Sequence, residues 1–473
     1  MWSTGSARPS LYLAGCFFLF FVPVVLTPFS GHDWQRTAHV VVAFLSLITL
    51  IRYAVKHADI TFLGVKARFV CLLLTGLGVL SAINSHQVSW AFVEVALLLA
   101  ACAIAGAFAV ERKAGDATYD RLVLTFVIVL CSVKTVQFFS AVAAVSISGV
   151  DVLDTTLLFN EFSNVRTYGQ FQTFTLPLLA LPLLLPTVKR STRAWTFALL
   201  ACWWMIAICG GTRGTWLGMA AASVLLSCLA PGGRRWATWQ LGAALAGGLL
   251  YWLLFSVLPS WMDIRVINPA SDRLTTDLSA RGVIWQQAWE MIKARPLLGF
   301  GPMHFADIPN NVAAHPHQSV LQWACEWGVP STLLVGWLAL RGLGATALLI
   351  RSTATSTAPE DVWRLCLFAS LIGALTQSMV DGVIVMPYSQ LWLCLVVGWL
   401  MGMHQWKVNP EPAALIYIRA WLVALVCAVT LLGYVVVRDF PHLEEKQQQY
   451  AREFGGHFQP RFWMQGVIAT KPQ

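Results

Sequence analysis

Charged residues are scarce in this sequence. Of its 473 residues, 12% are charged and 57% are apolar, and the mean hydropathy is +0.64. A soluble domain is about 25% charged and about 45–50% apolar, so this chain lacks the polar side chains that would coat a soluble globule of its size. The composition excludes a cytosolic enzyme, a disordered scaffold and a secreted disulfide module. It predicts an all-α polytopic membrane protein.

Metal-binding and disulfide motifs are also missing. Most of the eleven cysteines lie in apolar stretches and none form a Cys-x-x-Cys motif, so we interpret them as small buried hydrophobes. No Asp-x-Asp or His-x-x-x-His motif occurs, and Asp151 with Asp154 is a weak pair. We therefore expect neither a metal nor another cofactor. The net charge of +9 comes from cations in short loops, which is typical of membrane topology rather than of nucleic-acid binding.

Long apolar runs are abundant instead. A membrane span needs about 20 apolar residues, and thirteen candidate runs occur, or twelve if the last one, which Arg419 interrupts, is not a span. The first run lacks an Ala-x-Ala-like cleavage site, so we keep it as a span rather than a signal peptide. The 22 Trp fit interfacial belts. The runs are 11–30, 37–53, 69–85, 89–110, 122–145, 171–187, 194–210, 215–231, 238–258, 329–350, 364–384, 386–404 and 414–437.

Basic residues fall mainly in alternate loops, which we expect to be cytoplasmic, with the N-terminus inside. This expectation divides the chain into N-terminal spans (1–145), spans with two external arginine loops (146–258), a large periplasmic loop with amphipathic helices (259–325), C-terminal spans (326–437) and a tail (438–473) that thirteen spans would place outside. The basic set is Arg52, Lys56, Lys66, Arg68, Arg112, Lys113, Arg121, Lys189, Arg190, Arg193, Arg234, Arg235, Arg351 and Arg364.

The short external loops hold three arginines, Arg36, Arg166 and Arg213, which break the charge rule. Arg213 lies in the Gly-rich turn 210–215, where exposed N–H groups and a guanidinium fork would suit a phosphate. Arg166 directly precedes another span. A snorkelling or solvated interfacial arginine explains either position as well, so the pattern alone leaves both interpretations open.

The large external loop contains an amphipathic pattern, with apolar residues at 284, 285, 288, 289 and 292. This spacing predicts a helix, with Ser279 as its N-cap and an end at Arg295. Arg281 would lie in the first turn, where a cation opposes the helix dipole and a bound anion would offset that cost. Arg265 and Arg273 are weaker candidates, for which a solvated face is the simpler explanation.

A second helix is predicted from the apolar positions 320, 321, 324 and 325, with His317 in its first turn. The positive end of a helix favours neutral imidazole, which can accept a proton, so His317 is a candidate general base. A histidine that only caps or packs is an equal alternative. His315 and His304 could do the same work, and we rank them lower.

Two ionisable residues within the apolar runs stand out, Lys134 and Glu94, and Asp381 lies at the outer end of its span. Such groups are costly in a bilayer, so they are expected to be functional or paired. Buried pairing is at least as good an interpretation as catalysis. Asp381 could orient the loop or a catalytic group.

In this order the motifs are familiar, and over roughly residues 160–400 the chain resembles the O-antigen ligase family. The family often has Asn after the histidine, where this chain has Gln318, which keeps the amide and adds a methylene. The motifs that carry the resemblance are Gly-Thr-Arg213-Gly, Arg281 with Trp285, Pro296-Leu-Leu-Gly299-Phe-Gly301, His317 with Leu321, Glu326 and Gly328, and Asp381.

The resemblance implies a polytopic fold of the lipid-donor (GT-C type) glycosyltransferases and an inner-membrane enzyme with a periplasmic site. It implies metal-independent, inverting transfer of a glycan from undecaprenyl diphosphate to a sugar hydroxyl of lipid A-core. Arg213 and Arg281 would stabilise the diphosphate and His317 would deprotonate the acceptor. The candidate substrate-binding residues are Arg166, Arg265, His315 and Asp381.

Other functions remain open at this point. O-antigen polymerases and protein O-oligosaccharyltransferases share the domain, and many of the latter carry a larger soluble C-terminal region. A lipid-linked glycan transporter would explain the spans, but it predicts inverted repeats that the sequence does not show. A cell-wall glycan polymerase fits the His317 loop poorly.

Overall fold

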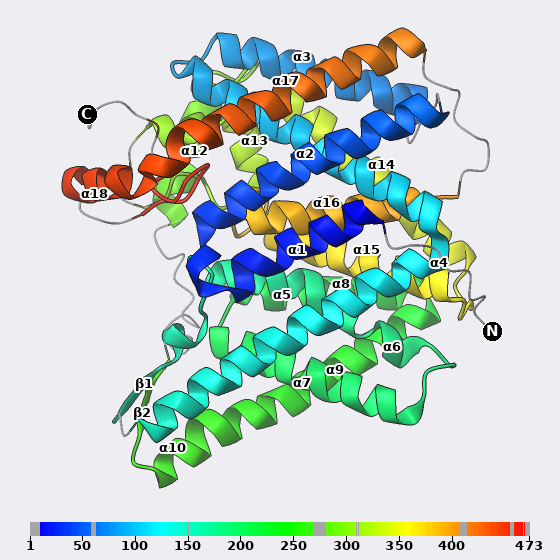
Figure 1. Ribbon diagram of the computed structural model, residues 1–473, viewed down its shortest axis with the longest axis vertical. Coiled ribbons are helices and arrows are strands. Elements are labelled where there is room, and N and C mark those ends of the chain that lie inside the picture. Colours follow the sequence, from blue (N-terminus) through cyan, green and yellow to red (C-terminus); the bar gives the residue numbers. More distant parts are fainter. Residues whose placement is uncertain are drawn as a thin grey trace.

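The computed structural model describes residues 10–57, 63–148, 151–268, 281–308, 310, 312–405, 414–454, 458–466 and 468. Within these ranges the chain is overwhelmingly helical, as an all-α polytopic membrane protein requires (Figure 1). The elements are α1 (Leu11–Val25), α2 (His32–His57), α3 (Val65–Ile83), α4 (Val88–Ile147), β1 (Val152–Asp154), α5 (Val165–Leu179), α6 (Leu181–Leu184), α7 (Arg190–Gly210), α8 (Arg213–Leu229), α9 (Pro231–Trp252), α10 (Leu258–Trp261), β2 (Arg265–Ile267), α12 (Arg281–Ala294), α13 (Ser319–Trp327), α14 (Val329–Ser352), α15 (Pro359–Gln377), α16 (Pro387–Gly402), α17 (Leu415–Asp439) and α18 (Leu443–Phe454).

Helix α4 doubles back on itself. Its residues Phe108 and Phe126 are 18 positions apart, which is about 27 Å along a straight helix at 1.5 Å per residue. Both rings nevertheless contact the ring of Phe20 in α1, at centroid distances of 6.4 and 6.2 Å. The helix must therefore bend sharply between them, so its two halves serve as two of the predicted spans.

Each of the thirteen predicted runs contains a helix, but fewer helices meet the requirements for crossing a membrane. Eight stretches of the described residues are long and apolar enough by length and composition, against the 12–13 predicted. Helices α1 and α8 are apolar but shorter. Helix α5 is short and buried along nearly its whole length, α16 has 16 residues, and α15 carries Glu360, Asp361 and Arg364. A helix surrounded by other helices can be shorter and more polar than one that faces lipid.

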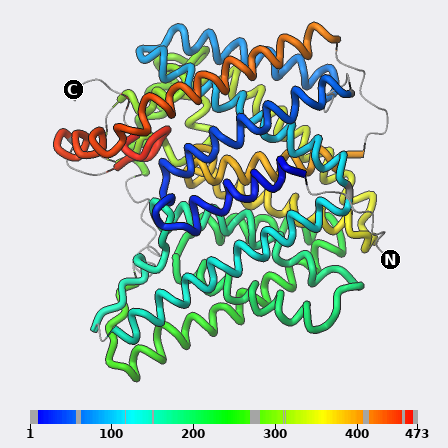
Figure 2. The backbone as a smooth tube through the Cα atoms, viewed as in Figure 1, coloured from blue at the N-terminus to red at the C-terminus, as the bar shows by residue number. Residues whose placement is uncertain are grey.

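The two ends of the bundle carry different structures. Figures 1 and 2 show α12, α13, α18 and the β1–β2 pair at one end, and the N-terminus of the chain at the other. The tail after α17 lies at the α12–α13 end, where Gln459 Nε2 donates to Asn310 O at 2.6 Å. We call this the site end. The tail therefore lies at the same end as the large loop, as an even number of crossings between the two segments requires.

The core of the bundle contains tryptophans that we expected in interfacial belts. The indole of Trp203 donates to Thr175 Oγ1 at 2.9 Å and that of Trp399 to Asp120 Oδ1 at 2.8 Å. Burial of a large indole is favourable once its N–H has such a partner. The belt interpretation was therefore wrong for the fully buried members, which are Trp203, Trp236, Trp392, Trp399 and Trp463.

Candidate active site at the end of the bundle

Arg166 and Arg213 are brought together by a close crossing of α5 and α8. The Thr215 hydroxyl donates to Gly169 O at 2.8 Å, and the Thr212 hydroxyl to Val165 O at 3.4 Å. A Cβ on Gly169 would lie 2.7 Å from the Thr212 side chain, so only glycine permits this approach. Each arginine directly follows one member of the Val165–Thr212 contact. The side chain of Arg166 is exposed, and that of Arg213 is half-buried.

The start of α5 is fixed by its own sequence. Asn164 caps the helix, because its Oδ1 accepts from the N–H groups of Arg166 and Thr167 at 2.9 and 3.1 Å. The Thr167 hydroxyl in turn accepts from Asn164 N–H at 3.3 Å, which completes a capping box. Arg166 therefore stands at a rigid helix start rather than in a loose loop.

Gln377 joins this crossing to Asp381. Its Oε1 accepts from the Thr173 hydroxyl of α5 at 2.5 Å, and its Nε2 donates to Asp381 Oδ2 at 3.2 Å. A Cβ on Gly214 of α8 would lie 2.9 Å from Gln377 Cγ, so α8 passes close by. Asp381 Oδ1 accepts from the Gly382 N–H at 2.8 Å. Asp381 lies in the turn after α15, which ends at Gln377, and not in the helix itself.

We expected His317 in the first turn of α13, but it lies just before the helix. Gln318 is the N-cap, and its Oε1 accepts from Leu321 N–H, so the glutamine amide at this position caps the helix. His317 has a φ of +53°, which is uncommon for a residue with a side chain and is found where the surroundings impose it. The loop is tied to the Asp381 turn, because Ser319 N–H donates to Ser378 O at 2.9 Å.

Arg281 reaches the same loop through α12. It is the first described residue of that helix, and one turn later the Trp285 indole donates to Pro316 O at 3.0 Å. Ile284 and Ala288 are buried in a small apolar cluster that joins α12 to α13. The predicted helix is therefore present, and most of its apolar face packs against protein, whereas Trp289 is exposed.

Charge and burial set the state of His317. Its Nδ1 lies 3.8 Å from Asp381 Oδ1. Burial lowers the pKa of His317 to about 4; Asp381 opposes this shift, while Arg166 and Arg281 add to it. Burial also lowers the pKa of Arg281, with Arg166 and Arg213 adding to the shift and Asp381 opposing it. Arg166, Arg213, Arg281, His317 and Asp381 thus influence one another, and we call them the electrostatic group. His317 is neutral within it.

The other two histidines have structural positions. His315 is 2% exposed, its Nδ1 accepts from His317 N–H at 3.3 Å, and a Cβ on Gly382 would lie 2.5 Å from its ring. Both ring nitrogens of His304 are engaged, since Nδ1 donates to Pro302 O at 2.9 Å and Nε2 accepts from Gln87 N–H at 2.8 Å. His304 therefore belongs to the scaffold, and His315 supports the backbone of His317.

The glycines of the Pro296–Gly301 motif allow a backbone approach to α13. Gly301 N–H donates to Glu326 O at 3.0 Å, and Phe300 N–H to Cys325 O at 2.9 Å. Gly299 has a φ of +68°, and a Cβ there would lie 2.4 Å from Glu326 O. This motif therefore supports the helix that follows His317.

Some candidates are not brought to this group. Arg265 lies in β2, with its side chain exposed and its N–H donating to Asp151 O at 2.8 Å, and Figure 1 places β2 well away from α12 and α13. Arg273 and Ser279 lie outside the described residues. The electrostatic group thus comprises Arg166, Arg213, Arg281, His317 and Asp381.

Several buried charges elsewhere have ion-pair or hydrogen-bond partners. Lys134 Nζ lies 2.7 Å from Glu161 Oε2, and both side chains are almost fully buried. Arg36, which is 1% exposed, donates from Nη1 to Gln390 Oε1 at 2.6 Å and from Nη2 to Val385 O at 2.9 Å. Glu94 lies 3.5 Å from Arg461 in the tail. Two contributors were missed from the sequence: Gln377, a polar residue in an apolar run, and Arg461, for which no motif gave a signal.

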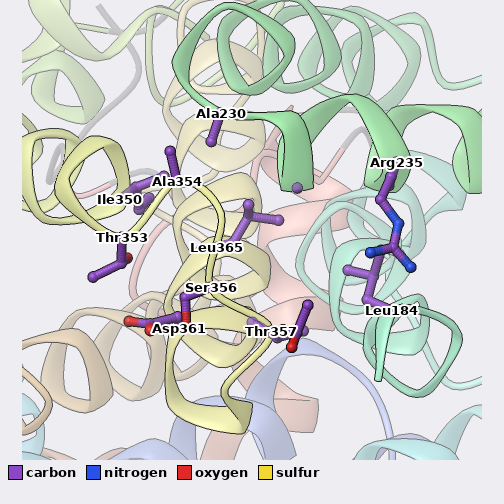
Figure 3. Close-up of a pocket in the computed structure, with 12 residues that line it drawn as sticks. Leu184, Ala230, Arg235, Ile350, Thr353, Ala354, Ser356, Thr357, Asp361 and Leu365 are labelled. Carbon is purple, nitrogen blue, oxygen red and sulfur yellow. The ribbon is translucent and has the colours of Figure 1, made fainter. Parts of the chain in front are cut away.

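The hollow drawn in Figure 3 is a separate feature. It is lined by residues of α6, of α9 and the residue before it, and of α14, α15 and their connection, among them Arg235, Thr357 and Asp361. Arg235 belongs to the basic loops that we expect to be cytoplasmic, at the opposite end of the bundle from His317. Among the described residues, no three His, Cys, Asp or Glu side chains are arranged to hold a metal ion.

A comparison with protein families matches residues 196–336 to the family model described as O-antigen ligase. This stretch of the chain is therefore similar to the O-antigen ligase domain. The matched residues include Arg213, Arg281 and His317, whereas Arg166 and Asp381 lie beyond its ends and are brought to it by the fold. A comparison with curated proteins gives no match.

Proposed function

We propose that this member of the O-antigen ligase family transfers a glycan from undecaprenyl diphosphate to a sugar hydroxyl of lipid A-core, at the periplasmic face of the inner membrane. The observation that carries the proposal is the electrostatic group itself. Arg166, Arg213 and Arg281 bring three positive charges to a neutral histidine that Asp381 faces. Like charges repel, so three arginines in one place favour a multiply charged anion between them.

The chemistry follows from these charges. A diphosphate is already a good leaving group, so it needs charge neutralisation rather than a protein nucleophile. His317 accepts the proton of the acceptor hydroxyl, and the hydroxyl oxygen forms a bond to the anomeric carbon. The bond from that carbon to the phosphate oxygen breaks, and its electron pair stays on the diphosphate, which the arginines stabilise. Attack from the face opposite the leaving group inverts the anomeric configuration.

The proton acceptor on His317 is its Nε2. Nδ1 is buried and faces Asp381, while the side chain as a whole keeps 17% of its surface exposed. A proton on Nδ1 interacts favourably with the carboxylate, which leaves the Nε2 lone pair for the acceptor hydroxyl. Asp381 therefore selects the tautomer, as the carboxylate does in a catalytic triad.

The experiment that tests this function is product identification. Purified protein is incubated with undecaprenyl-diphosphate glycan and lipid A-core, with EDTA and without nucleotide. A product in which the glycan is linked to lipid A-core, with inverted anomeric configuration, supports the proposal. Longer glycan chains on undecaprenyl diphosphate would make the protein a polymerase. Movement of the lipid-linked glycan across proteoliposome membranes without transfer would make it a transporter, and glycan on an added protein acceptor would make it an oligosaccharyltransferase.

A further inference from the structure

The last described segment of the chain is built into the site end. Residues 458–466, the C-terminal strap, carry Arg461, Phe462 and Trp463, whose exposed fractions are 1, 2 and 2%. The strap follows α18 and lies beside α12 and α13 (Figure 1). Chain ends are usually poorly ordered unless something holds them, so the burial of three large residues here calls for a specific anchor.

The backbone of the strap is held by α2. Arg36 donates from Nε to Phe462 O at 3.2 Å and from Nη2 to Arg461 O at 3.3 Å. Met464 N–H donates to Asp33 Oδ1 at 2.8 Å. Since Arg36 also binds Val385 O, it ties the strap to the segment that follows Asp381.

The Arg461 side chain extends from the strap into the structure around α13. Its Nη2 lies 2.6 Å from Glu326 Oε2 and 3.5 Å from Glu94 Oε1, and Nη1 lies 3.5 Å from Ala314 O. The Gln322 amide fits best with its oxygen toward Arg461, at 3.1 and 3.2 Å from the two guanidinium nitrogens. The Arg461 guanidinium therefore links Gln322 and Glu326 of α13 to Glu94 of α4 and to Ala314, the residue before His315.

These contacts enclose the loop that carries His317. Ala314 precedes the His315–His317 segment, and α13 begins directly after Gln318. Arg461 also helps to lower the pKa of His315, although burial is the largest cause and the charge of His317 comes next. Glu326 Oε1 accepts from Phe305 N–H at 3.0 Å, so the same ion pair fixes the segment on the far side of the helix. Burial raises the pKa of the Glu326 carboxyl, and Arg461 opposes that rise.

We propose that Arg461 is a positioning residue, which acts through Ala314, Gln322 and Glu326 to hold His317 against Asp381. The inference rests on the proposed role of His317 as the base. A purely structural anchor would also need a buried ion pair, but it would not need to contact both the loop before His315 and the first helix after His317. The C-terminal strap is then a part of the site, even though it lies well beyond the domain matched by the family model.

The test compares variants that do not leave Glu326 as an unpaired charge. Arg461→Gln with Glu326→Gln removes both charges of the 2.6 Å pair at once, while Glu94, whose side chain is 14% exposed, keeps its charge. Gln322→Leu keeps the ion pair and removes only the amide contact, so it serves if the double variant does not fold. Arg438→Gln is the matched control, because Arg438 is a C-terminal arginine that also pairs with a carboxylate, Asp439, but its side chain is 44% exposed.

Two readouts separate positioning from stability. The first is the pKa of His317, measured without substrate by hydrogen–deuterium exchange at the imidazole C2 atom. In the double variant we expect it to rise by roughly one unit toward its ordinary value, because a displaced loop exposes the ring. The second is transfer kinetics, where we expect kcat to fall by about tenfold or more and KM for the lipid-linked donor to stay within about threefold. Gln322→Leu should change both in the same direction by less, and the control should match the wild type.

The outcomes are distinct. A double variant, or a folded Gln322→Leu variant, with the wild-type His317 pKa and the wild-type kcat per folded molecule would overturn the proposal and leave Arg461 as a stability residue. If the wild-type protein transfers no glycan, the proposed function fails. The exchange measurement then still decides whether Arg461 holds the His317 loop in place.

Discussion

His317 Nδ1 lies 3.8 Å from Asp381 Oδ1, and neither residue could have been paired with the other from spacing in the chain. The distance is too long for a hydrogen bond, although such contacts often tighten only when substrate is bound. The carboxylate is fixed on both oxygens, by Gln377 Nε2 and by Gly382 N–H. Two opposing influences act on the pKa of the His317 imidazole: Asp381 raises it, while Arg166 and Arg281 lower it.

This balance predicts a pH profile. A base must be neutral to act, so kcat/KM of the wild type should fall only as the pH drops through about 4, well below the ordinary histidine value of about 6.5. We call this fall in kcat/KM the acidic limb. Removing a cation that lowers the pKa of His317 moves the limb to higher pH, so Arg281→Ala should shift it by roughly one unit toward neutrality. Asp381→Asn removes the group that raises the pKa and should shift the limb down. Arg265→Ala, in β2, should leave the limb in place; equal limbs in all three variants would exclude His317 as the titrating base.

A second prediction concerns the space around His315. A Cβ on Gly382 would lie 2.5 Å from the His315 ring, so Gly382→Ala must push His315, and with it the backbone of His317. We expect about a tenfold loss of kcat, with a destabilisation of about 1–3 kcal/mol typical of overpacking. Gly336→Ala in α14 is the control, because a Cβ there meets nothing within 4 Å. Unchanged kcat in Gly382→Ala would show that the loop adapts without cost.

The buried Lys134–Glu161 pair gives a stability prediction. Lys134 Nζ lies 2.7 Å from Glu161 Oε2, and the Thr27 hydroxyl also donates to Glu161 Oε1 at 3.2 Å. Lys134→Met would leave a buried carboxylate alone and should destabilise the protein by about 3–5 kcal/mol. The double variant Lys134→Met with Glu161→Gln should recover most of that loss. Thermal unfolding in detergent measures these variants together with the single variant Glu161→Gln; full additivity of the two single variants would mean that the charges do not interact.

Much of the fold is predictable from the sequence, because apolar runs have no alternative to helices in a bilayer. The alternation of basic loops predicts that α12, α13 and the strap lie on the same side of the membrane. In the structure all three lie at one end of the bundle. The number of crossing helices was less predictable. Helices such as α5 and α15 are surrounded by protein rather than by lipid. They can therefore be shorter or more polar than a lipid-facing span, and hydropathy does not identify them as spans.

The site was predictable in part. Arg213, Arg281 and His317 were identified by residue type within external turns, and the structure brings them together with Arg166 and Asp381. The reason given for a neutral His317 was wrong, since it precedes the helix and burial with two arginines keeps it neutral. Gln377 and Arg461 could not be predicted, because their roles depend on contacts between segments more than a hundred residues apart.

The central claim is that the arginines and His317 form one transfer site. The most direct test is the initial rate of glycan transfer to lipid A-core by Arg213→Ala and His317→Ala, with Arg235→Ala, at the opposite end of the bundle, as the control. Loss of one charge that stabilises the leaving group, or of the base, should each slow transfer by about 100-fold or more, while the control keeps the wild-type rate. Near-normal transfer by either site variant, in protein that inserts and folds normally, would contradict the account.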